Sequence, residues 1–140
     1  EAQHYLDLIN YKILYDQLRI SYKNSHDSKS NQYNQSEEIK FNYDIVLISK
    51  LVNIAEKMED SKKVLESFDI VISGIKNSSS KIQTEEFLIL FEKIVSRNKE
   101  KSIHEKALNY LLADFGKLYQ QVEIRPKVFQ LVGNLKMELM

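Results

Sequence analysis

The sequence predicts an all-α protein of about six helices, packed either as an array of helical hairpins or as an irregular helical bundle. Six stretches place apolar residues three and four positions apart, which is the spacing of one face of a helix. The chain of 140 residues also holds only one proline and three glycines. A β-rich fold needs more of both for its turns, so we expect essentially no sheet.

The first expected helix is a tyrosine-rich segment within residues 1–23, and its stretch 4–23 carries two apolar stripes. One stripe is rich in tyrosine and consists of Leu8, Tyr11, Tyr15, Leu18 and Tyr22. The other lies about 100° around the helix, is aliphatic, and consists of Leu6, Ile9, Ile13 and Ile20. A helix with two apolar stripes is covered on two sides, so we expect this helix to contact more than one neighbour.

A polar segment, residues 24–36, follows the first helix. We expect it to be a loop of about a dozen residues, which is longer than most connections between helices. From Ser36 we expect the chain to be helical again, with Glu37 and Glu38 in the first turn, where the helix dipole favours carboxylates. Residues 38–45 alternate polar and apolar side chains like a strand. Because the apolar residues that follow continue at helical spacing, we favour a helix there.

Three further helices have recognisable starts in the sequence. We expect Asp60 or Ser61 to cap the first of them. Thr84 is expected to cap the second in the same way. Ser102 and Glu105 have the spacing of a capping box, in which each side chain reaches the backbone amide of the other residue. This pair predicts the start of the third helix.

The last helix and the hydrophobic core are also predicted from residue type and position. Pro126 fits the first turn of the last helix, since a proline there removes no hydrogen bond from the helix. The centre of the core is expected to consist of large apolar residues that lie on the inward stripes of their helices. These residues are Phe68, Phe91, Leu111 and Phe115.

The expected helix starts near residues 37, 61, 84 and 102 pair into hairpins. The hairpins repeat about every 40 to 47 residues, which matches the two-helix units of HEAT-like or armadillo-like solenoids. The two units agree in pattern but not in residues, so the spacing does not separate a short solenoid from a bundle. We expect a single domain over residues 1–140, with the helical array in residues 37–140. Because the chain begins at Glu1 rather than at a methionine, we expect it to be a processed chain or a segment of a larger protein.

The charge and the apolar runs exclude several classes of function. The formal charge is zero, from 20 basic and 20 acidic residues, so the chain has no broad basic surface for nucleic acid or anionic lipid. The longest unbroken apolar run, residues 87–91, is far shorter than the roughly 20 residues that a membrane-spanning helix needs. No cysteine is present, which excludes disulfides and thiolate ligands. We expect neither nucleic-acid binding nor membrane insertion.

No catalytic or ligand-binding motif can be assembled from the sequence. His104 and Glu105 begin like the zinc-binding pattern His-Glu-x-x-His, but Leu108 stands where the second histidine is needed. We therefore expect His104 to be an exposed residue of a first helical turn. The three glycines are solitary, and a close helix crossing is the favoured explanation for Gly116. We expect no enzymatic activity, no cofactor, no metal site and no small-molecule substrate.

The tyrosines of the first helix are the strongest indication of a function. Tyrosine has an apolar body and a polar tip, which suits surfaces that are buried at one end and wet at the other, and protein interfaces are enriched in it. Two interpretations remain open. In one, the helix packs entirely on its own core. In the other, the aliphatic stripe packs inward, and the tyrosine-rich stripe binds a protein partner or a second copy through Tyr11, Tyr15, Leu18 and Tyr22. Asp16 interrupts the aliphatic stripe and needs solvent or a partner there, which favours the reverse assignment, with the tyrosine-rich stripe inward and the aliphatic stripe outward.

These observations lead us to expect a protein-binding scaffold or adaptor domain that acts without catalysis, in the cytoplasm or nucleus. An alternative is a secreted or surface-anchored helical bundle that binds a host or extracellular ligand. The abundance of lysine, isoleucine and asparagine is typical of a microbe with an AT-rich genome and is compatible with that alternative.

Overall fold

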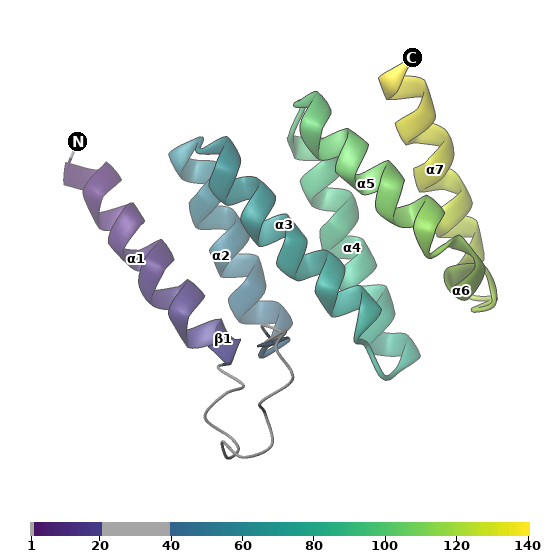
Figure 1. Cartoon of the computed structure of the whole chain (residues 1–140), viewed down its shortest axis with the longest axis horizontal. Helices are drawn as coiled ribbons and strands as arrows, with labels where there is room; N and C mark the ends of the chain where they lie inside the picture. Colours follow the sequence, from purple (N-terminus) through teal and green to yellow (C-terminus); the bar gives the residue numbers. More distant parts are fainter. Residues whose placement is uncertain (1, 21–39) are drawn as a thin grey trace, which may run out of the picture. The chain divides into compact units, whose positions relative to one another are not determined.

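The computed structural model describes residues 2–20 and 40–140, and these residues form seven helices and one short pair of strands (Figure 1). The helices are α1 (Ala2–Leu18), α2 (Ile45–Met58), α3 (Ser61–Lys76), α4 (Lys81–Arg97), α5 (Lys101–Ala113), α6 (Phe115–Tyr119) and α7 (Arg125–Leu139). The strands are β1 (Arg19–Ile20) and β2 (Lys40–Phe41). The all-α prediction is confirmed. In the described ranges, no helix is long and apolar enough to cross a membrane.

The backbone divides into two compact units, Glu1–Ile70 and Val71–Met140, and the division falls within α3. In the first unit, α1 packs along α2 (Figure 1). The core of this unit contains side chains with no exposed surface, namely Leu18, Ile48, Leu51, Val52, Ala55 and Phe68. The expectation that the whole chain forms a single domain stays a prediction.

The first helix ends earlier than the sequence predicts. The helix stops at Leu18, and the next two residues pair with β2 in an antiparallel register that joins Arg19 to Phe41. The amide of Asn42 then donates a hydrogen bond to the Leu18 carbonyl at 2.8 Å, so the residue that follows β2 provides a partner for a carbonyl at the end of α1. The prediction of a helix over residues 4–23 is therefore wrong at its C-terminal end.

The strand-like alternation before α2 has a counterpart in the structure. Residues 40–41 form β2, and α2 begins only at Ile45. The carboxylate of Asp44 accepts hydrogen bonds from the amides of Val46 and Leu47 at 3.0 and 3.2 Å, which caps the helix. The prediction of a helix through residues 38–45 is therefore wrong, because the helix begins only after its N-cap residue Asp44. The expected loop at residues 24–36 and the expected start at Ser36, Glu37 and Glu38 lie outside the described residues.

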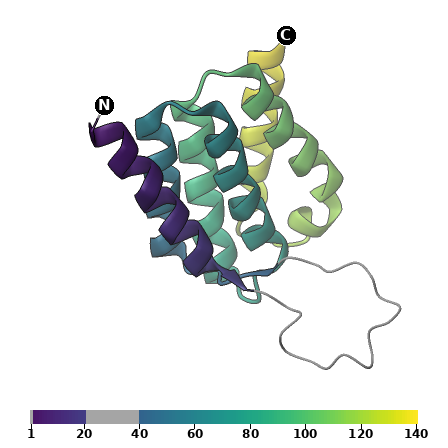
Figure 2. The ribbon, with the colours of Figure 1, turned by 60° about the vertical axis from the view of Figure 1, so that its left-hand side comes forward.

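In the second unit, α5 lies alongside α7, and α6 contacts both (Figure 2). Phe91 and Leu111 are fully buried in this unit, and Phe68 is fully buried in the first, as predicted. Phe115 is only half-buried, so its place in the core was wrongly predicted. The cause is a break at Asp114, which ends α5 and carries Phe115 into the separate helix α6.

Two of the predicted helix starts are confirmed. The Asp60 carboxylate accepts hydrogen bonds from the amides of Lys62 and Lys63 at 3.1 and 3.2 Å, and thus caps α3. Pro126 lies in the first turn of α7. The first amides of a helix have no partner within the helix. Asp60 accepts hydrogen bonds from two such amides, and Pro126 has no amide N–H that would need a partner.

The other two predicted starts are wrong. Ser80 caps α4 by accepting a hydrogen bond from the Gln83 amide at 3.1 Å, whereas Thr84 lies inside the helix and donates to the Ser80 carbonyl. The capping box of Ser102 and Glu105 does not form, because α5 already begins at Lys101. The observed cap of α4, Ser80, lies four residues before the predicted Thr84, and the residue at the cap position of α5, Glu100, lies two residues before the predicted Ser102.

The glycine that permits close helix packing is Gly74, not Gly116. A methyl group at Gly116 would meet no atom of the described residues within 4 Å, so the explanation by a helix crossing is wrong. At Gly74 a methyl group would lie 2.6 Å from the ring of Phe87. The missing side chain of Gly74 thus lets the fully buried Phe87 ring pack directly on the backbone of α3.

Candidate functional site

The structure reverses the predicted orientation of α1. Tyr11 and Leu18 are 3% and 0% exposed, whereas Leu6, Ile9 and Ile13 are 51%, 55% and 52% exposed. The tyrosine-rich stripe therefore packs inward, and the aliphatic stripe faces outward. The assignment of the aliphatic stripe to the core is wrong.

Polar partners explain why the tyrosine side of α1 is the buried one. The Tyr11 hydroxyl donates a hydrogen bond to Glu66 Oε1 at 2.7 Å, and the Lys63 ammonium lies 5.1 Å from the centre of the Tyr11 ring. The buried carboxylate of Asp7, on the same side of α1, accepts a hydrogen bond from Gln3 at 2.9 Å and lies 3.7 Å from the Lys57 ammonium. A buried tyrosine is stable when its hydroxyl has a partner, and α3 supplies one here.

Tyr11 remains a neutral phenol in this position. Burial raises its pKa far above the ordinary value, and the hydrogen bond to the Glu66 carboxylate raises the pKa further. A phenolate beside this carboxylate would be both desolvated and repelled. Tyr11 therefore acts as a neutral anchor between α1 and α3 and not as a proton donor or nucleophile.

A groove of about 420 Å³ opens beside this anchor, along α1 and the first turns of α3. Its lining combines aromatic, aliphatic and charged side chains, namely Leu8, Tyr11, Lys12, Tyr15, Asp16, Arg19, Lys63 and Glu66. We call this surface the tyrosine groove. All of its lining residues belong to the first unit, so its geometry is defined within that unit.

Tyr15 provides a rigid aromatic wall for the tyrosine groove. Its ring stacks on Tyr11 with 6.2 Å between centroids and makes an edge contact with Phe41 at 5.8 Å. The Tyr15 side chain is half-buried. Burial raises the pKa of its hydroxyl above the ordinary value, and the negative charge of the Glu66 carboxylate raises this pKa further. A ring that is fixed on one side and open on the other can bind an apolar group with little loss of side-chain entropy.

The charged groups along the groove differ in whether they have a partner within it. Lys12 and Asp16 form an ion pair at 3.2 Å, and Glu66 accepts the hydrogen bond from Tyr11. Among the described residues, Arg19 forms no ion pair or hydrogen bond through its guanidinium. Arg19 is also exposed, so its five N–H donors are available to a ligand.

The structure brings two of the four sequence-predicted site residues together. Tyr11 and Tyr15 both line the tyrosine groove. Leu18 is completely buried and is therefore part of the core, and Tyr22 lies outside the described residues. Lys63 and Glu66 could not be predicted as groove residues, because they lie on α3, more than 50 positions along the chain from Tyr11.

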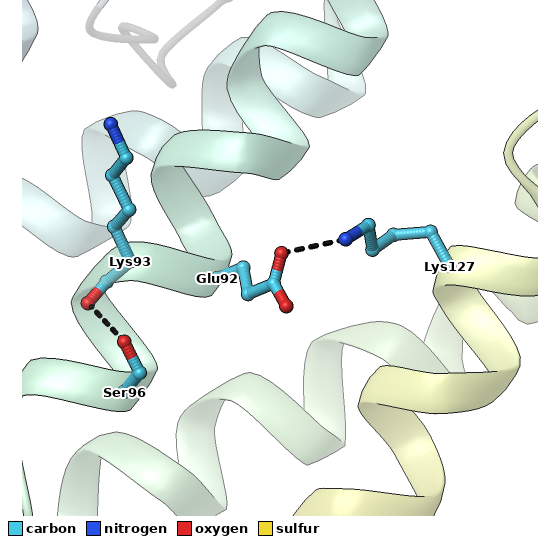
Figure 3. A network of polar contacts seen from close by, with 4 residues as sticks. All are labelled: Glu92, Lys93, Ser96 and Lys127. Carbon is cyan, nitrogen blue, oxygen red and sulfur yellow. Dashed lines mark hydrogen bonds and ion pairs between the residues drawn. The ribbon is translucent and has the colours of Figure 1, made fainter.

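A second concave surface lies in the other unit, between α4, α5 and α7. This cleft has a volume of about 390 Å³, and its lining includes Glu92, Ser96, His104, Leu131 and Leu135. At its edge Glu92 of α4 forms an ion pair with Lys127 of α7 at 2.8 Å, while the Ser96 hydroxyl donates to a backbone carbonyl of its own helix (Figure 3). These polar groups are already paired.

His104 has a structural role beside this cleft. The side chain is 5% exposed, so the prediction of an exposed histidine is wrong. Its Nε2 atom lies 2.8 Å from the Asn98 carbonyl oxygen and 3.1 Å from the Val95 carbonyl oxygen, and its N–H donates to these acceptors at the end of α4. The histidine thus satisfies carbonyls that the helix leaves without partners. In the part of the chain that the structure describes, no group of three or more acidic or histidine side chains is arranged to hold a metal ion.

Comparison of the chain with protein-family models, with curated proteins and with solved structures finds no match.

Proposed function

We propose that the chain is a protein-binding domain of the scaffold or adaptor type, which acts without catalysis and binds its partner in the tyrosine groove. The observation that carries this proposal is the combination of Tyr15 and Arg19 on one open surface. Tyrosine and arginine are enriched among the residues that contribute most to protein interfaces. Here the tyrosine ring is held in place by Tyr11 and Phe41, and the arginine is exposed beside it.

The chemistry of the groove indicates the kind of segment that it accepts. Leu8 and the open side of Tyr15 offer an apolar contact, and Arg19 offers a planar, bidentate site for a carboxylate. We infer that the partner inserts an apolar side chain against Tyr15 and places an acidic side chain on Arg19. An acidic group on the partner would also be attracted by Lys63, which lines the same groove.

The experiment is a quantitative affinity purification with the chain as bait, followed by mass spectrometry. The wild type is compared with Arg19→Glu and Tyr15→Ala. The matched control is Lys50→Glu, which reverses an exposed charge of the same unit on α2, outside the groove. Each bait is first checked for its melting temperature.

The proposal predicts that a specific partner is recovered by the wild type and by Lys50→Glu but lost with Arg19→Glu. Reversal of the charge would repel the acidic side chain of the partner. Tyr15→Ala should weaken recovery of the same partner. Equal recovery of every protein by the wild type and Arg19→Glu would rule out the groove as the binding site.

A further inference from the structure

The cleft between α4, α5 and α7 is lined by a buried histidine with one ring nitrogen that the fold does not use. His104 is 5% exposed and lines this cleft of about 390 Å³. Its Nε2 atom is bound to two carbonyls at the end of α4, whereas its Nδ1 atom forms no hydrogen bond with any described residue. We call this surface the His104 cleft. All of its lining residues belong to the second unit.

The unused nitrogen is accessible from outside the protein. In the described ranges, no enclosed side-chain nitrogen lacks a hydrogen-bond partner. His104 Nδ1 lacks a partner, so this atom is not enclosed and keeps a small open surface. The rest of the side chain is buried, which indicates that the open surface faces the cleft that His104 lines.

The contacts of Nε2 decide which kind of group Nδ1 can bind. Both partners of Nε2 are carbonyl oxygens, which only accept hydrogen bonds, so Nε2 carries the proton. A neutral imidazole has one N–H, and its other nitrogen is then an acceptor. Nδ1 therefore offers a lone pair, and the complementary group on a ligand is an O–H or N–H donor.

The surroundings of Nδ1 favour a neutral donor on an apolar body. The apolar part of the lining consists of Val95, Leu131, Leu135 and Met137, and the two leucines are buried. An ammonium group in contact with these side chains would lose its hydration. A carboxylate would bring no donor for the lone pair. A hydroxyl group on an apolar body meets both requirements.

An aromatic body fits the His104 cleft better than an aliphatic one. The thioether of Met137 makes favourable contacts with aromatic rings. A hydroxyl on an aromatic ring is also more acidic than an aliphatic alcohol and is therefore the stronger hydrogen-bond donor. The volume of the cleft lies near the lower end of the range of about 300 to 1,000 Å³ found for small-molecule pockets, which suits a ligand with one ring.

We propose that the His104 cleft binds a phenol, whose hydroxyl donates a hydrogen bond to His104 Nδ1 and whose ring packs against Leu131, Leu135 and Met137. The phenol is either a free small molecule or the tyrosine side chain of another protein, because both present the same ring and the same hydroxyl. The site lies within the second unit and does not depend on the tyrosine groove.

Nitrogen NMR of the histidine rings tests this proposal on the full chain at about pH 8, where an ordinary histidine is neutral. The probes are para-cresol and toluene, which share a ring and differ in the hydroxyl. Before any probe is added, the spectrum should show the His104 proton on Nε2. Para-cresol should then shift the Nδ1 resonance of His104 to saturation and leave the exposed His4 unchanged. Toluene should bind about tenfold more weakly, which is the loss expected for one hydrogen bond.

Two variants separate ligand binding from the structural role of His104. His104→Gln keeps an N–H donor for the carbonyls at the end of α4 but has no acceptor at the position of Nδ1, and His4→Gln is its matched control. Val95→Phe places a ring in the cleft from a half-buried position of α4. Binding of para-cresol to each variant is followed on the ligand by saturation-transfer NMR, and the melting temperature establishes that the variant is folded.

The wild type and His4→Gln should bind para-cresol, whereas His104→Gln and Val95→Phe should not. Absence of binding by the wild type overturns the proposal, and so does equal binding of toluene, a His104 ring that carries its proton on Nδ1, or full binding by folded His104→Gln. N-acetyltyrosinamide distinguishes the two sources, because affinity equal to that of para-cresol identifies a tyrosine side chain and weaker binding identifies a small phenol. Arg19→Glu should bind para-cresol like the wild type, so failure of the proposed partner binding leaves this test unaffected.

Discussion

Replacement of Gly74 by alanine introduces a single methyl group at the closest approach between α3 and a side chain of α4. The new carbon would lie 2.6, 2.7 and 2.9 Å from three carbons of the Phe87 ring, whereas ordinary carbon contacts are about 3.5 to 4.0 Å. The ring would have to move by close to 1 Å to restore ordinary contacts. Phe87 is fully buried, so neighbouring side chains oppose that movement.

The magnitude follows from two opposing effects. Overpacking of a core by a methyl group costs about 1 to 3 kcal/mol, and alanine in place of glycine inside a helix returns about 0.5 to 1 kcal/mol. We expect Gly74→Ala to lower the free energy of unfolding by up to about 2.5 kcal/mol. The measurement is urea unfolding at equilibrium, followed by far-ultraviolet circular dichroism.

The chain provides a matched control for this substitution. Gly133→Ala adds the same methyl group inside a helix, but in open space, and should raise the free energy of unfolding by about 0.5 to 1 kcal/mol. Gly74→Ala should cost less stability in a Phe87→Leu background than in the wild type, because the smaller side chain at position 87 makes room for the methyl group. The effects of the two substitutions on the free energy of unfolding are therefore coupled. Equal stabilisation by Gly74→Ala and Gly133→Ala would refute the packing described for α3 and α4.

Three further predictions concern the second unit. Phe91→Ala should lower the free energy of unfolding by about 3 to 5 kcal/mol. Phe129→Ala should lower it by less than half as much, because Phe91 is fully buried and Phe129 is not. Equal losses for the two variants in urea unfolding would contradict the assignment of the core. His104→Leu should cost about 1 to 3 kcal/mol, because two carbonyls at the end of α4 lose their donor, and an unchanged urea midpoint would show that the donor is dispensable. The pKa of Glu123 is lowered because Lys81 donates a hydrogen bond to its carboxylate. The pair therefore stabilises the fold at pH values above the ordinary pKa of glutamate. This stabilisation is lost as the pH falls through the acidic range and the carboxylate becomes protonated. The melting temperatures of wild type and Glu123→Gln should therefore differ slightly at neutral pH and converge at acidic pH; a difference that persists in acid would contradict this linkage.

Helix type and several boundaries could be predicted from the sequence because their signals are local. Asp60 caps α3 and Pro126 begins α7 through contacts within one helical turn. The break at Asp114 was not predicted, since the apolar spacing continues across it and only the pairing of α5 and α6 with α7 selects it. The close approach at Gly74 was missed for a similar reason, because it depends on Phe87 of another helix.

The orientation of α1 could not be derived from periodicity because both of its stripes are apolar. Periodicity identifies which residues share a face but not which of two similar faces meets the core. The decision depends on α3, which places Glu66 within hydrogen-bonding distance of Tyr11. Asp16 in the aliphatic stripe was the one local indication of the observed orientation. The tyrosine groove likewise depends on residues of two separate segments, and only its α1 side could be predicted.

The orientation of α1 is the central claim of this account, and thiol accessibility tests it most directly. The natural chain contains no cysteine, so single substitutions Ile9→Cys and Leu18→Cys each introduce one unique thiol. Labelling of the folded protein with a thiol reagent, at a protein concentration where the chain is monomeric, is compared with labelling in denaturant. We predict that the thiol at position 9 reacts almost as fast in the folded protein as in denaturant, whereas the thiol at position 18 is strongly protected. Protection at position 9 together with rapid labelling at position 18 would contradict the inward packing of the tyrosine side, and with it the groove proposed as the binding site.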